Sequence, residues 1–497
     1  MTVHESALIL AIDAGTTGVT ALVVDHSAEV VASGYREFTQ HFPGDGRVEH
    51  DLGEIWSATL ASAEQALKQI DRSAITAVGI TNQRETWCMW DRETLGAARP
   101  AIVWQDRRTA GLCQSLREAG HEPLIVERTG LRLDPYFSAT KAMWVRNHEP
   151  HLWAQVEQGR IAMGTIDSFL VARMTRGLEH ITDATNASRT LLFDIHAGAW
   201  SSQLCDVFGV PMDALPTVVP SYGPLAITDP NVFCGLEVPI TGIAGDQQAA
   251  LAGQAGFGAG AAKCTYGTGS FLLVHTGETA VASKQGLLTT VALQHPDGRL
   301  DYALEGAVFV TGSAVQWLRD GLRIIDTAPE VESLARSVPD SAGLVFVPAL
   351  TGLGAPDWDP DARGLIIGIT RGTTDAHVAR ATLEAIAFEV RDVVQLMVNE
   401  GGIDLQSLAI DGGAASNDLL CQMQADQLQL PVDRSAELQT TGLGAAFLAG
   451  LGVGIWSNID ELRSSRKSSG IFTPQQRDDE SYARWRKAVE RSKNWID

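Results

Sequence analysis

Two turns rich in glycine and threonine have a composition suited to holding phosphate groups. Asp13 follows an apolar run, and residues 15–18 (GTTG) come almost directly after it. Backbone N–H groups and two hydroxyls of such a turn can face a phosphate, while Asp13 could hold a cation through water. The alternative is a hairpin turn in which Asp13 only caps its own backbone. The segment 266–270 (YGTGS) has the same phosphate-binding composition far along the chain.

The spacing of these two turns predicts two related halves. An offset of 252 residues places Gly267 on Gly15, close to half of the 497 residues. A triphosphate held between two domains needs donors from both sides, although G-T turns are common and chance is the alternative explanation. We expect an N-terminal domain over 1–250 and a C-terminal domain over 251–497.

Asp246 is a candidate general base. It stands between Gly245 and a helical pattern in the segment 242–251 (GIAGDQQAAL). An aspartate at a helix start is most often an N-cap. The functional alternative is a carboxylate that accepts the proton of a substrate hydroxyl as its oxygen attacks phosphorus. Gln247 could then hold a neighbouring hydroxyl.

Arg84 and Glu85 place a basic and an acidic side chain next to each other after a short apolar run. They could form an exposed charge pair on a loop. They could also bind a polyol, with Arg84 donating to and Glu85 accepting from adjacent hydroxyls, each charged bond contributing roughly 1.5–3 kcal/mol. Three aromatic side chains could cover the carbon side of such a ligand: Trp104, Tyr136 and Phe271.

Strand and helix patterns alternate along the chain and would position these residues. Apolar runs predict strands at 7–12, 20–24, 78–80, 87–90, 101–104, 262–266, 271–274 and 408–410. Apolar residues at three- and four-residue steps predict helices over 52–70 and 375–401, and another helix is expected to start near 417. The class is α/β with mixed sheets. The polar, charged region after residue 464 is expected to be loosely ordered.

Composition excludes several classes of partner. The charge is −22, from 38 basic and 60 acidic residues, which disfavours broad attraction to nucleic acid or an anionic membrane. An anionic small ligand would need backbone N–H groups, a metal ion or a few placed arginines. The N-terminal residues lack a signal-peptide pattern, and no run is apolar enough to span a bilayer. Six scattered cysteines suit neither zinc nor a disulfide framework, so we expect a cytoplasmic protein.

Several long motifs resemble the glycerol kinases, a family within the carbohydrate kinases that carry an FGGY signature. They include LAIDAGTTG at 10–18, GITNQRETW at 79–87, GIAGDQQAALAGQ at 242–254, YGTGSFLL at 266–273 and DGGAASN at 411–417. The resemblance implies two actin-like (ribonuclease-H-like) ATPase domains that flank a catalytic cleft. It implies transfer of the γ-phosphoryl group of ATP, with Mg²⁺, to glycerol, giving sn-glycerol 3-phosphate. The family commonly forms homodimers and homotetramers.

The resemblance also assigns roles to residues that match the family motifs. Asp246 would be the base and Asp13 the magnesium-associated carboxylate. The residues implied in glycerol binding are Arg84, Glu85, Trp104, Tyr136, Asp246, Gln247 and Phe271. The residues implied in nucleotide binding are Thr16, Thr17, Gly18, Thr20, Thr268, Gly312, Gln316, Gly413 and Asn417.

This chain departs from the family pattern at a few positions. Thr20 stands where an arginine or lysine usually reaches the nucleotide phosphates, so either nucleotide affinity is lower or another cation substitutes. Ala14 and Asp357 replace the usual glutamine and tyrosine. The segment 231–238 lacks the arginine loop that binds fructose 1,6-bisphosphate in some members, and Val232 replaces a histidine that is phosphorylated in others. We expect neither control to operate.

Two alternative functions stay open at this point. One is another FGGY kinase, acting on a pentose, a pentitol or dihydroxyacetone, which would share the nucleotide motifs. The other is an actin-like ATPase or a sugar-sensing regulator that binds without phosphorylating. The motifs NQRET and DPYFSATK favour glycerol over the first, and Asp246 weighs against the second.

Overall fold

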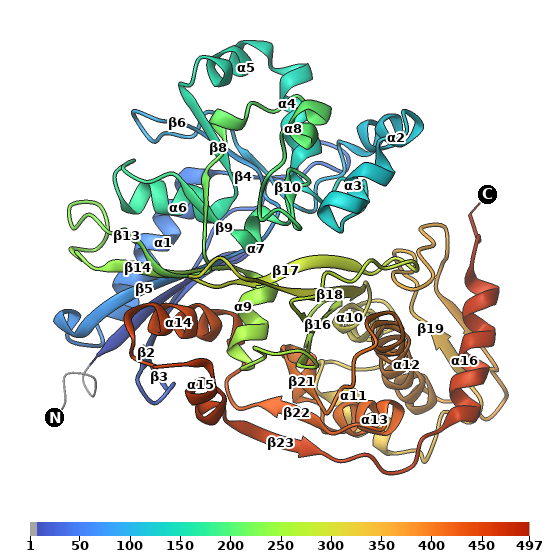
Figure 1. Cartoon of the computed structure of the whole chain (residues 1–497). Coiled ribbons are helices and arrows are strands. Elements are labelled where there is room, and N and C mark those ends of the chain that lie inside the picture. Colours follow the sequence, from blue (N-terminus) through green and yellow to red (C-terminus); the bar gives the residue numbers. More distant parts are fainter. Residues whose placement is uncertain (1–6, 497) are drawn as a thin grey trace.

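Two large mixed sheets form the frame of the protein, one in each half (Figure 1). The structure is a computed structural model and describes residues 7–496. The first sheet has the order β13-β14-β5-β1-β2-β3, and the second β17-β18-β16-β15-β21-β22-β23. The strands of the first sheet are β1 (Leu8–Ala14), β2 (Gly18–Asp25), β3 (Val30–Glu37), β5 (Ile75–Asn82), β13 (Tyr222–Ile227) and β14 (Pro239–Gly245). Those of the second are β15 (Ala262–Tyr266), β16 (Ser270–Gly277), β17 (Leu288–Gln294), β18 (Leu300–Val308), β21 (Leu408–Asp411), β22 (Val432–Ser435) and β23 (Ser468–Phe472).

The two sheets share one plan. β1 pairs antiparallel with β2 and parallel with β5, and β15 pairs antiparallel with β16 and parallel with β21. Each half therefore has a hairpin whose first strand also runs beside a parallel neighbour. The two G-T turns, at 15–18 and 266–270, connect equivalent strands of these hairpins.

Short helices and strand pairs add a further layer to the N-terminal half (Figure 1). Its helices are α2 (Ala110–Glu118), α3 (Glu122–Thr129), α4 (Ser138–His148), α5 (Pro150–Glu157), α6 (Ile166–Met174), α7 (Ala184–Ala187) and α8 (Ser202–Phe208). Its short strands are β4 (Glu49–His50), β6 (Cys88–Asp91), β7 (Ala101–Ile102), β8 (Ile161–Gly164), β9 (Ile181–Asp183), β10 (Phe193–Asp194), β11 (Ala199–Trp200) and β12 (Thr217–Val219). Helix α1 (Leu52–Leu67) packs against β2 and β3.

Two helices form the seam between the halves. α9 (Asp246–Gly253) follows β14, and α14 (Thr440–Val453) packs on both α9 and the first sheet. A Cβ added at Gly253 would lie 2.0 Å from the Thr440 carbonyl oxygen, and one at Gly444 would lie 1.8 Å from that of Ala249. These contacts allow only hydrogen at both positions, so the two glycines let the helices approach closely. A late segment of the chain thereby supports the helix that carries Asp246.

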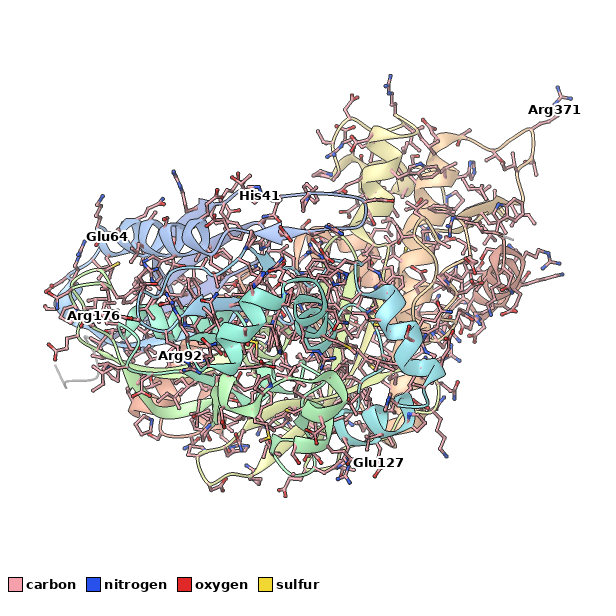
Figure 2. The ribbon with its side chains drawn as sticks, turned by 90° about the horizontal axis from the view of Figure 1, so that it is seen from above. His41, Glu64, Arg92, Glu127, Arg176 and Arg371 are labelled. Atoms are coloured by element: carbon pink, nitrogen blue, oxygen red, sulfur yellow. The ribbon has the colours of Figure 1, made fainter. Side chains whose placement is uncertain are left out.

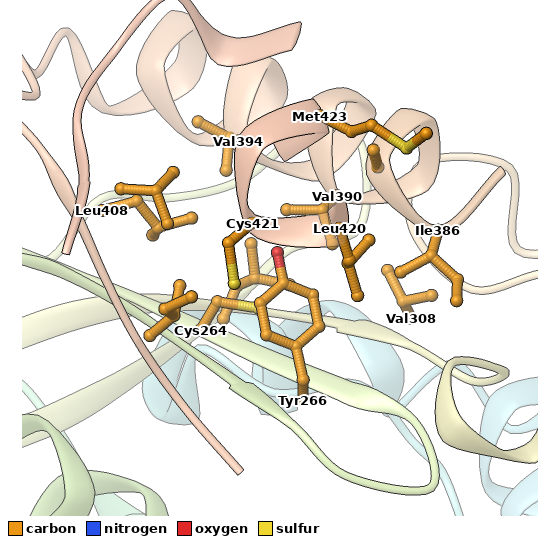
Figure 3. Close-up of a cluster of buried hydrophobic side chains, with 14 of the residues drawn as sticks. Cys264, Tyr266, Val308, Ile386, Val390, Val394, Leu408, Leu420, Cys421 and Met423 are labelled. Atoms are coloured by element: carbon orange, nitrogen blue, oxygen red, sulfur yellow. The ribbon is translucent and has the colours of Figure 1, made fainter. Parts of the chain in front are cut away.

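The core of the C-terminal half lies between the second sheet and its helices. Figure 3 shows Tyr266 and Cys264 of the sheet beneath Val390 of α12 (Asp375–Gly401) and Cys421 of α13 (Asp418–Leu428). The buried Tyr266 hydroxyl donates to Gln424 Oε1 at 2.7 Å, which satisfies its polar end. The end of β15, where the second G-T turn begins, is therefore anchored in a packed core.

The other named helices and strands of the C-terminal half lie outside its main sheet. They are α10 (Gly312–Asp320), α11 (Glu330–Arg336), β19 (Val345–Val347), β20 (Leu365–Ile367), α15 (Ile459–Ser465) and α16 (Asp479–Ser492). From above, exposed Arg371 lies at the tip of a projecting loop, at the opposite side from Glu64 and Arg176 of the N-terminal half (Figure 2). Within residues 7–496, no helix has the length and apolar character needed to cross a bilayer.

The region after residue 464 is ordered, and the expectation of a loose segment is wrong. β23 joins the edge of the second sheet beside β22. α16 buries Trp485 and Val489, and Asp479 accepts from Arg391 Nη2 at 2.9 Å. Only a narrow apolar stripe faces the core, so the polar composition of this segment hides its amphipathic pattern.

Candidate active site

Arg84 and Glu85 are buried directly after β5. Only 2% of Arg84 and 1% of Glu85 is exposed. Glu85 has φ of +62°, a backbone region that non-glycine residues rarely adopt, and the Arg84 carbonyl accepts the Thr86 N–H at 2.8 Å. This tight turn leaves both charged side chains in the interior. The alternative of an exposed charge pair on a loop is wrong.

Asp246 is the first residue of α9, with Gly245 in the N-cap position. Its Oδ1 accepts the Gln247 N–H at 2.7 Å, so the carboxylate binds the backbone of the first helical turn from within the helix rather than from the N-cap position. Its Oδ1 lies 3.1 Å from Arg84 Nε, and 30% of the side chain is exposed, so a ligand can reach it. Burial raises the pKa of Asp246 above its ordinary 3.8, while Arg84 and Lys263 oppose the rise. A partly exposed carboxylate with a raised pKa is a suitable general base.

Two aromatic residues connect the polyol candidates to the first G-T turn. Trp104 and Tyr136 pack edge to face with ring centroids 5.6 Å apart. Trp104 Nε1 donates to Thr16 Oγ1 at 2.9 Å, and Arg84 Nη2 lies 3.5 Å from the Tyr136 hydroxyl. Phe271 lies on β16 of the second sheet, and no ring contact joins it to these two residues in the described part of the chain.

The first phosphate-binding candidate lies between β1 and β2. The Thr16 carbonyl accepts a hydrogen bond from Gln40, and the Thr17 carbonyl accepts one from Phe38. These bonds hold the turn against residues 38–40, which directly follow β3. Gly18 begins β2. Asp13 is directly opposite Thr20 across the β1–β2 pair. Burial and the negative charge of Asp246 raise the pKa of Asp13 to about 7.

Thr20 faces open space. Together with Asp13, Tyr35 and Gln439 it lines a cavity of about 420 Å³. An arginine or lysine at position 20 would have room to extend there. The departure from the family pattern therefore leaves a space where a cationic side chain is usual.

The second phosphate-binding candidate is joined to its neighbours by backbone hydrogen bonds. The Thr268 carbonyl accepts from Thr311 N at 2.9 Å and from Ser313 N at 3.1 Å, and Gly312 N donates to Gly267 at 3.0 Å. These bonds bring the start of α10 onto the turn. Gln316 is one helical turn further along α10.

The segment after β21 lies against the same turn. A Cβ at Gly412, which has φ of +87°, would be 2.6 Å from the Tyr266 carbonyl oxygen, so this contact requires glycine. Gly413 then begins a short 3₁₀ helix, and Asn417 Oδ1 caps α13 by accepting from Leu420 N at 2.9 Å. The amide NH₂ group of Asn417 can donate to a ligand while Oδ1 caps the helix.

Three buried charged residues at this site were missed by sequence reasoning. Glu305 Oε2 accepts from Arg84 Nη1 at 2.6 Å, and Glu305 Oε1 accepts from Arg189 Nη2 at 2.9 Å. Arg189 Nε donates to Glu85 at 2.7 Å. Lys263 Nζ donates to Gln247 Oε1 and, at 3.0 Å, to Thr265 Oγ1. Charged residues inside apolar strand patterns, as Lys263 in 262–266 and Glu305 in 300–308, were the available signal.

No group of three His, Cys, Asp or Glu side chains within residues 7–496 could hold a metal on protein ligands alone. Burial is the main cause of the raised pKa of Asp13, and repulsion from the Asp246 carboxylate adds to it. A divalent cation that shares its ligands with a nucleotide would relieve that repulsion. The donor set therefore fits a magnesium ion that arrives with its phosphates.

Comparisons with known proteins cover both halves. A family model of the N-terminal domain of the FGGY family of carbohydrate kinases matches residues 8–253, and one of the C-terminal domain matches 262–453. The chain belongs to the FGGY family of carbohydrate kinases. Within that family it is 52% identical to the glycerol kinase of Aromatoleum aromaticum over 98% of this chain and 99% of that protein. It is 49% identical to the glycerol kinase of Halorhodospira halophila over 99% and 97%.

Solved structures agree with this assignment. Plasmodium falciparum glycerol kinase with ADP has a TM-score of 0.92 and 35% identity, with 98% of each chain covered. A xylulose kinase from Lactobacillus acidophilus has a TM-score of 0.85 at 21% identity and so shares the fold. The expected two-domain kinase fold and the resemblance to glycerol kinases are confirmed.

Proposed function

We propose that the protein transfers the γ-phosphoryl group of ATP to glycerol, releasing ADP and sn-glycerol 3-phosphate, with Asp246 as the general base. The observation that carries this proposal is the position of the Asp246 carboxylate, which is 3.1 Å from buried Arg84 at the start of the seam helix α9. The names of the full-length relatives support the same reaction.

The proposed reaction is a direct in-line transfer. Arg84 and Glu85 would hold two hydroxyls of glycerol, and Tyr136 and Gln247 would contact it from either side. Asp246 would take the proton of the third hydroxyl as its oxygen forms a bond to the γ-phosphorus. The bond from that phosphorus to the bridging oxygen breaks, and ADP leaves with the electron pair. Trp104 and Phe271 would cover the carbon atoms of glycerol.

The nucleotide would lie between the two G-T turns. Thr16, Thr17 and Gly18 would face its phosphates from the first half, and Thr268 from the second. Gly312, Gln316, Gly413 and Asn417 would hold the remainder of the nucleotide. A bound Mg²⁺ ion beside Asp13 would supply charge neutralisation at the phosphates. Closure of the halves would exclude water and limit ATP hydrolysis.

A Thr20→Arg variant is expected to bind ATP more tightly. A charged hydrogen bond to a phosphate contributes roughly 1.5–3 kcal/mol, so we expect the KM for ATP to fall by about 10-fold at saturating glycerol. The cavity beside Thr20 has room for the side chain. Thr20→Met is the matched control of similar length without charge and should leave this KM within about twofold. An equal decrease in both variants would contradict the electrostatic explanation.

The acceptor is identified by measuring how fast the enzyme releases ADP from ATP in the presence of each of several polyols and sugars. Glycerol, dihydroxyacetone, erythritol, xylulose and ribulose are compared with a control that has no acceptor. We expect the highest kcat/KM with glycerol and little release without an acceptor. Preference for a pentulose would support another FGGY kinase, and release independent of acceptor would support an ATPase.

We further propose that the protein works in the cytoplasm and forms a homodimer or homotetramer. The six cysteines are free thiols in the described structure, and five of them are buried, which suits a reducing compartment. The oligomeric state follows from the family resemblance alone. Light scattering at micromolar concentration measures it directly.

A further inference from the structure

Two buried charged residues of the second sheet reach the polyol-binding candidates of the N-terminal half. Lys263 lies on β15, and Glu305 lies on β18. Lys263 has 0% and Glu305 2% of its surface exposed. An ionised side chain without solvent needs close partners. Both find these partners among residues that we assign to glycerol.

Glu305 holds the Arg84 guanidinium at both ends. Its Oε2 lies 2.6 Å from Arg84 Nη1, and its Oε1 lies 3.1 Å from Arg84 Nη2. Such a two-point contact fixes the plane of the guanidinium group and leaves the Nε edge facing Asp246. Arg189, bonded to the same carboxylate, continues the network to Glu85. Burial opposes ionisation of Glu305, but Arg189 and Arg84 outweigh it and hold its pKa at about 2.

Lys263 determines which end of the Gln247 amide is free. The ammonium group donates to Gln247 Oε1 and to Thr265 Oγ1. With Oε1 held by the Lys263 ammonium group, the amide NH₂ group of Gln247 is placed to donate to a substrate hydroxyl. Burial lowers the pKa of Lys263, and the Asp246 carboxylate is among the nearby groups that oppose this fall.

We propose that Lys263 and Glu305 are positioning residues of the phosphoryl-transfer site, through which the second sheet orients Gln247 and Arg84 for the polyol. This inference rests on the proposed function. It means that the polyol-binding side chains of the first half have the orientation needed for binding only while the second sheet lies against them. Neither residue needs to touch the substrate.

The charges around Asp246 predict that loss of the Lys263 charge and loss of the Glu305 charge have opposite effects on the pH profile of activity. Asp246 is faced by Arg84 after β5, Lys263 on β15, Glu305 on β18 and Asp13 on β1. Lys263 lowers the pKa of Asp246 and Glu305 raises it. Loss of the Lys263 charge should move the acidic limb of the pH profile upward, and loss of the Glu305 charge should move it downward.

The test compares Lys263→Met and Glu305→Gln with the unaltered enzyme in glycerol-dependent ADP release at saturating MgATP. We expect kcat/KM for glycerol to fall by about 10-fold or more, mainly through KM, with the KM for ATP within about twofold. The acidic limbs should move in opposite directions, upward for Lys263→Met and downward for Glu305→Gln. Limbs that move in the same direction, or unchanged KM for glycerol, would overturn the proposal. No glycerol-dependent release from the unaltered enzyme would instead refute the proposed function.

A double-mutant cycle keeps the proposal testable if Glu305→Gln does not fold. Lys263→Met is combined with Gln247→Ala, and folding of each variant is checked by ADP affinity. If Lys263 acts through Gln247, the double variant should lose little more than Gln247→Ala alone. Losses that multiply in the double variant would contradict the positioning role.

Discussion

An Asp246→Asn variant is expected to lose about 10²- to 10⁴-fold in kcat, because asparagine cannot accept the proton of the attacking hydroxyl. Its size and shape match those of aspartate, so the packing of α9 should persist. The affinity for ADP should stay within about twofold, since the proposed nucleotide contacts come from other residues. Steady-state ADP release and a direct ADP titration measure the two quantities.

The matched control for this variant is Asp45→Asn. Asp45 is exposed on a loop and belongs to no proposed contact, so this change removes the same charge away from the seam. It should leave kcat and KM unchanged. Near-normal turnover of Asp246→Asn would refute the assignment of the base. Equal losses in both variants would point to a general effect of net charge.

An Asp13→Asn variant is expected to lose activity and gain stability. We expect kcat to fall by at least about 10²-fold, because the carboxylate that we propose for the magnesium ion is lost. The ligand-free variant should unfold about 1–2 °C higher than the unaltered protein at pH 8. The reason is the raised pKa of Asp13, about 7 in the folded protein against an ordinary 3.8.

The size of this stability effect depends on pH. Between about pH 4 and pH 7 the folded protein holds a proton on Asp13 that the unfolded chain has released. The stability contributed by the neutral carboxyl group is therefore lost as the pH rises through about 7. The advantage of Asp13→Asn should be largest at pH 8, smaller at pH 5 and absent below about pH 4. Thermal unfolding across this range measures it, and an advantage that grows toward low pH would contradict the account.

Local patterns predicted the elements that carry the two G-T turns. The run at 262–266 coincides with β15, and the periodic segment 375–401 coincides with α12. Each of these elements has a strong apolar pattern with the period of its own type of secondary structure, and tertiary packing reinforces it. The helix expected over 52–70 ends at Leu67. Helix ends depend on local capping and are the least predictable part of a pattern.

Contacts between residues far apart in the sequence determine the features that local sequence patterns do not predict. Nothing near Arg84 in the sequence shows that it is buried, because its main partner Glu305 is 221 residues away. The return of α14 to the first sheet is hidden for the same reason, since its partners Gly253 and Ala249 precede it by nearly two hundred residues. The division of the chain at residue 250 stays a prediction.

The C-terminal segment shows how a polar sequence can still pack. Arg486 of α16 lies 2.7 Å from Asp392 of α12 and 3.0 Å from Asp357, so ion pairs as well as Trp485 hold the helix in place. Asp357 departs from the tyrosine usual in the family. The partners of Arg486 precede it by 94 and 129 residues, so the sequence after residue 464 alone could not reveal them.

The amount of sn-glycerol 3-phosphate formed for each ADP released is the most direct test of the proposed reaction. Both products are measured in the same sample with ATP, magnesium and glycerol, and ADP is measured again without glycerol. The proposed seam site predicts equal amounts of the two products, with ADP release without glycerol slower by about 100-fold or more because closure excludes water. ADP release that is equally fast without glycerol, or that is not matched by the phosphate ester, would contradict it.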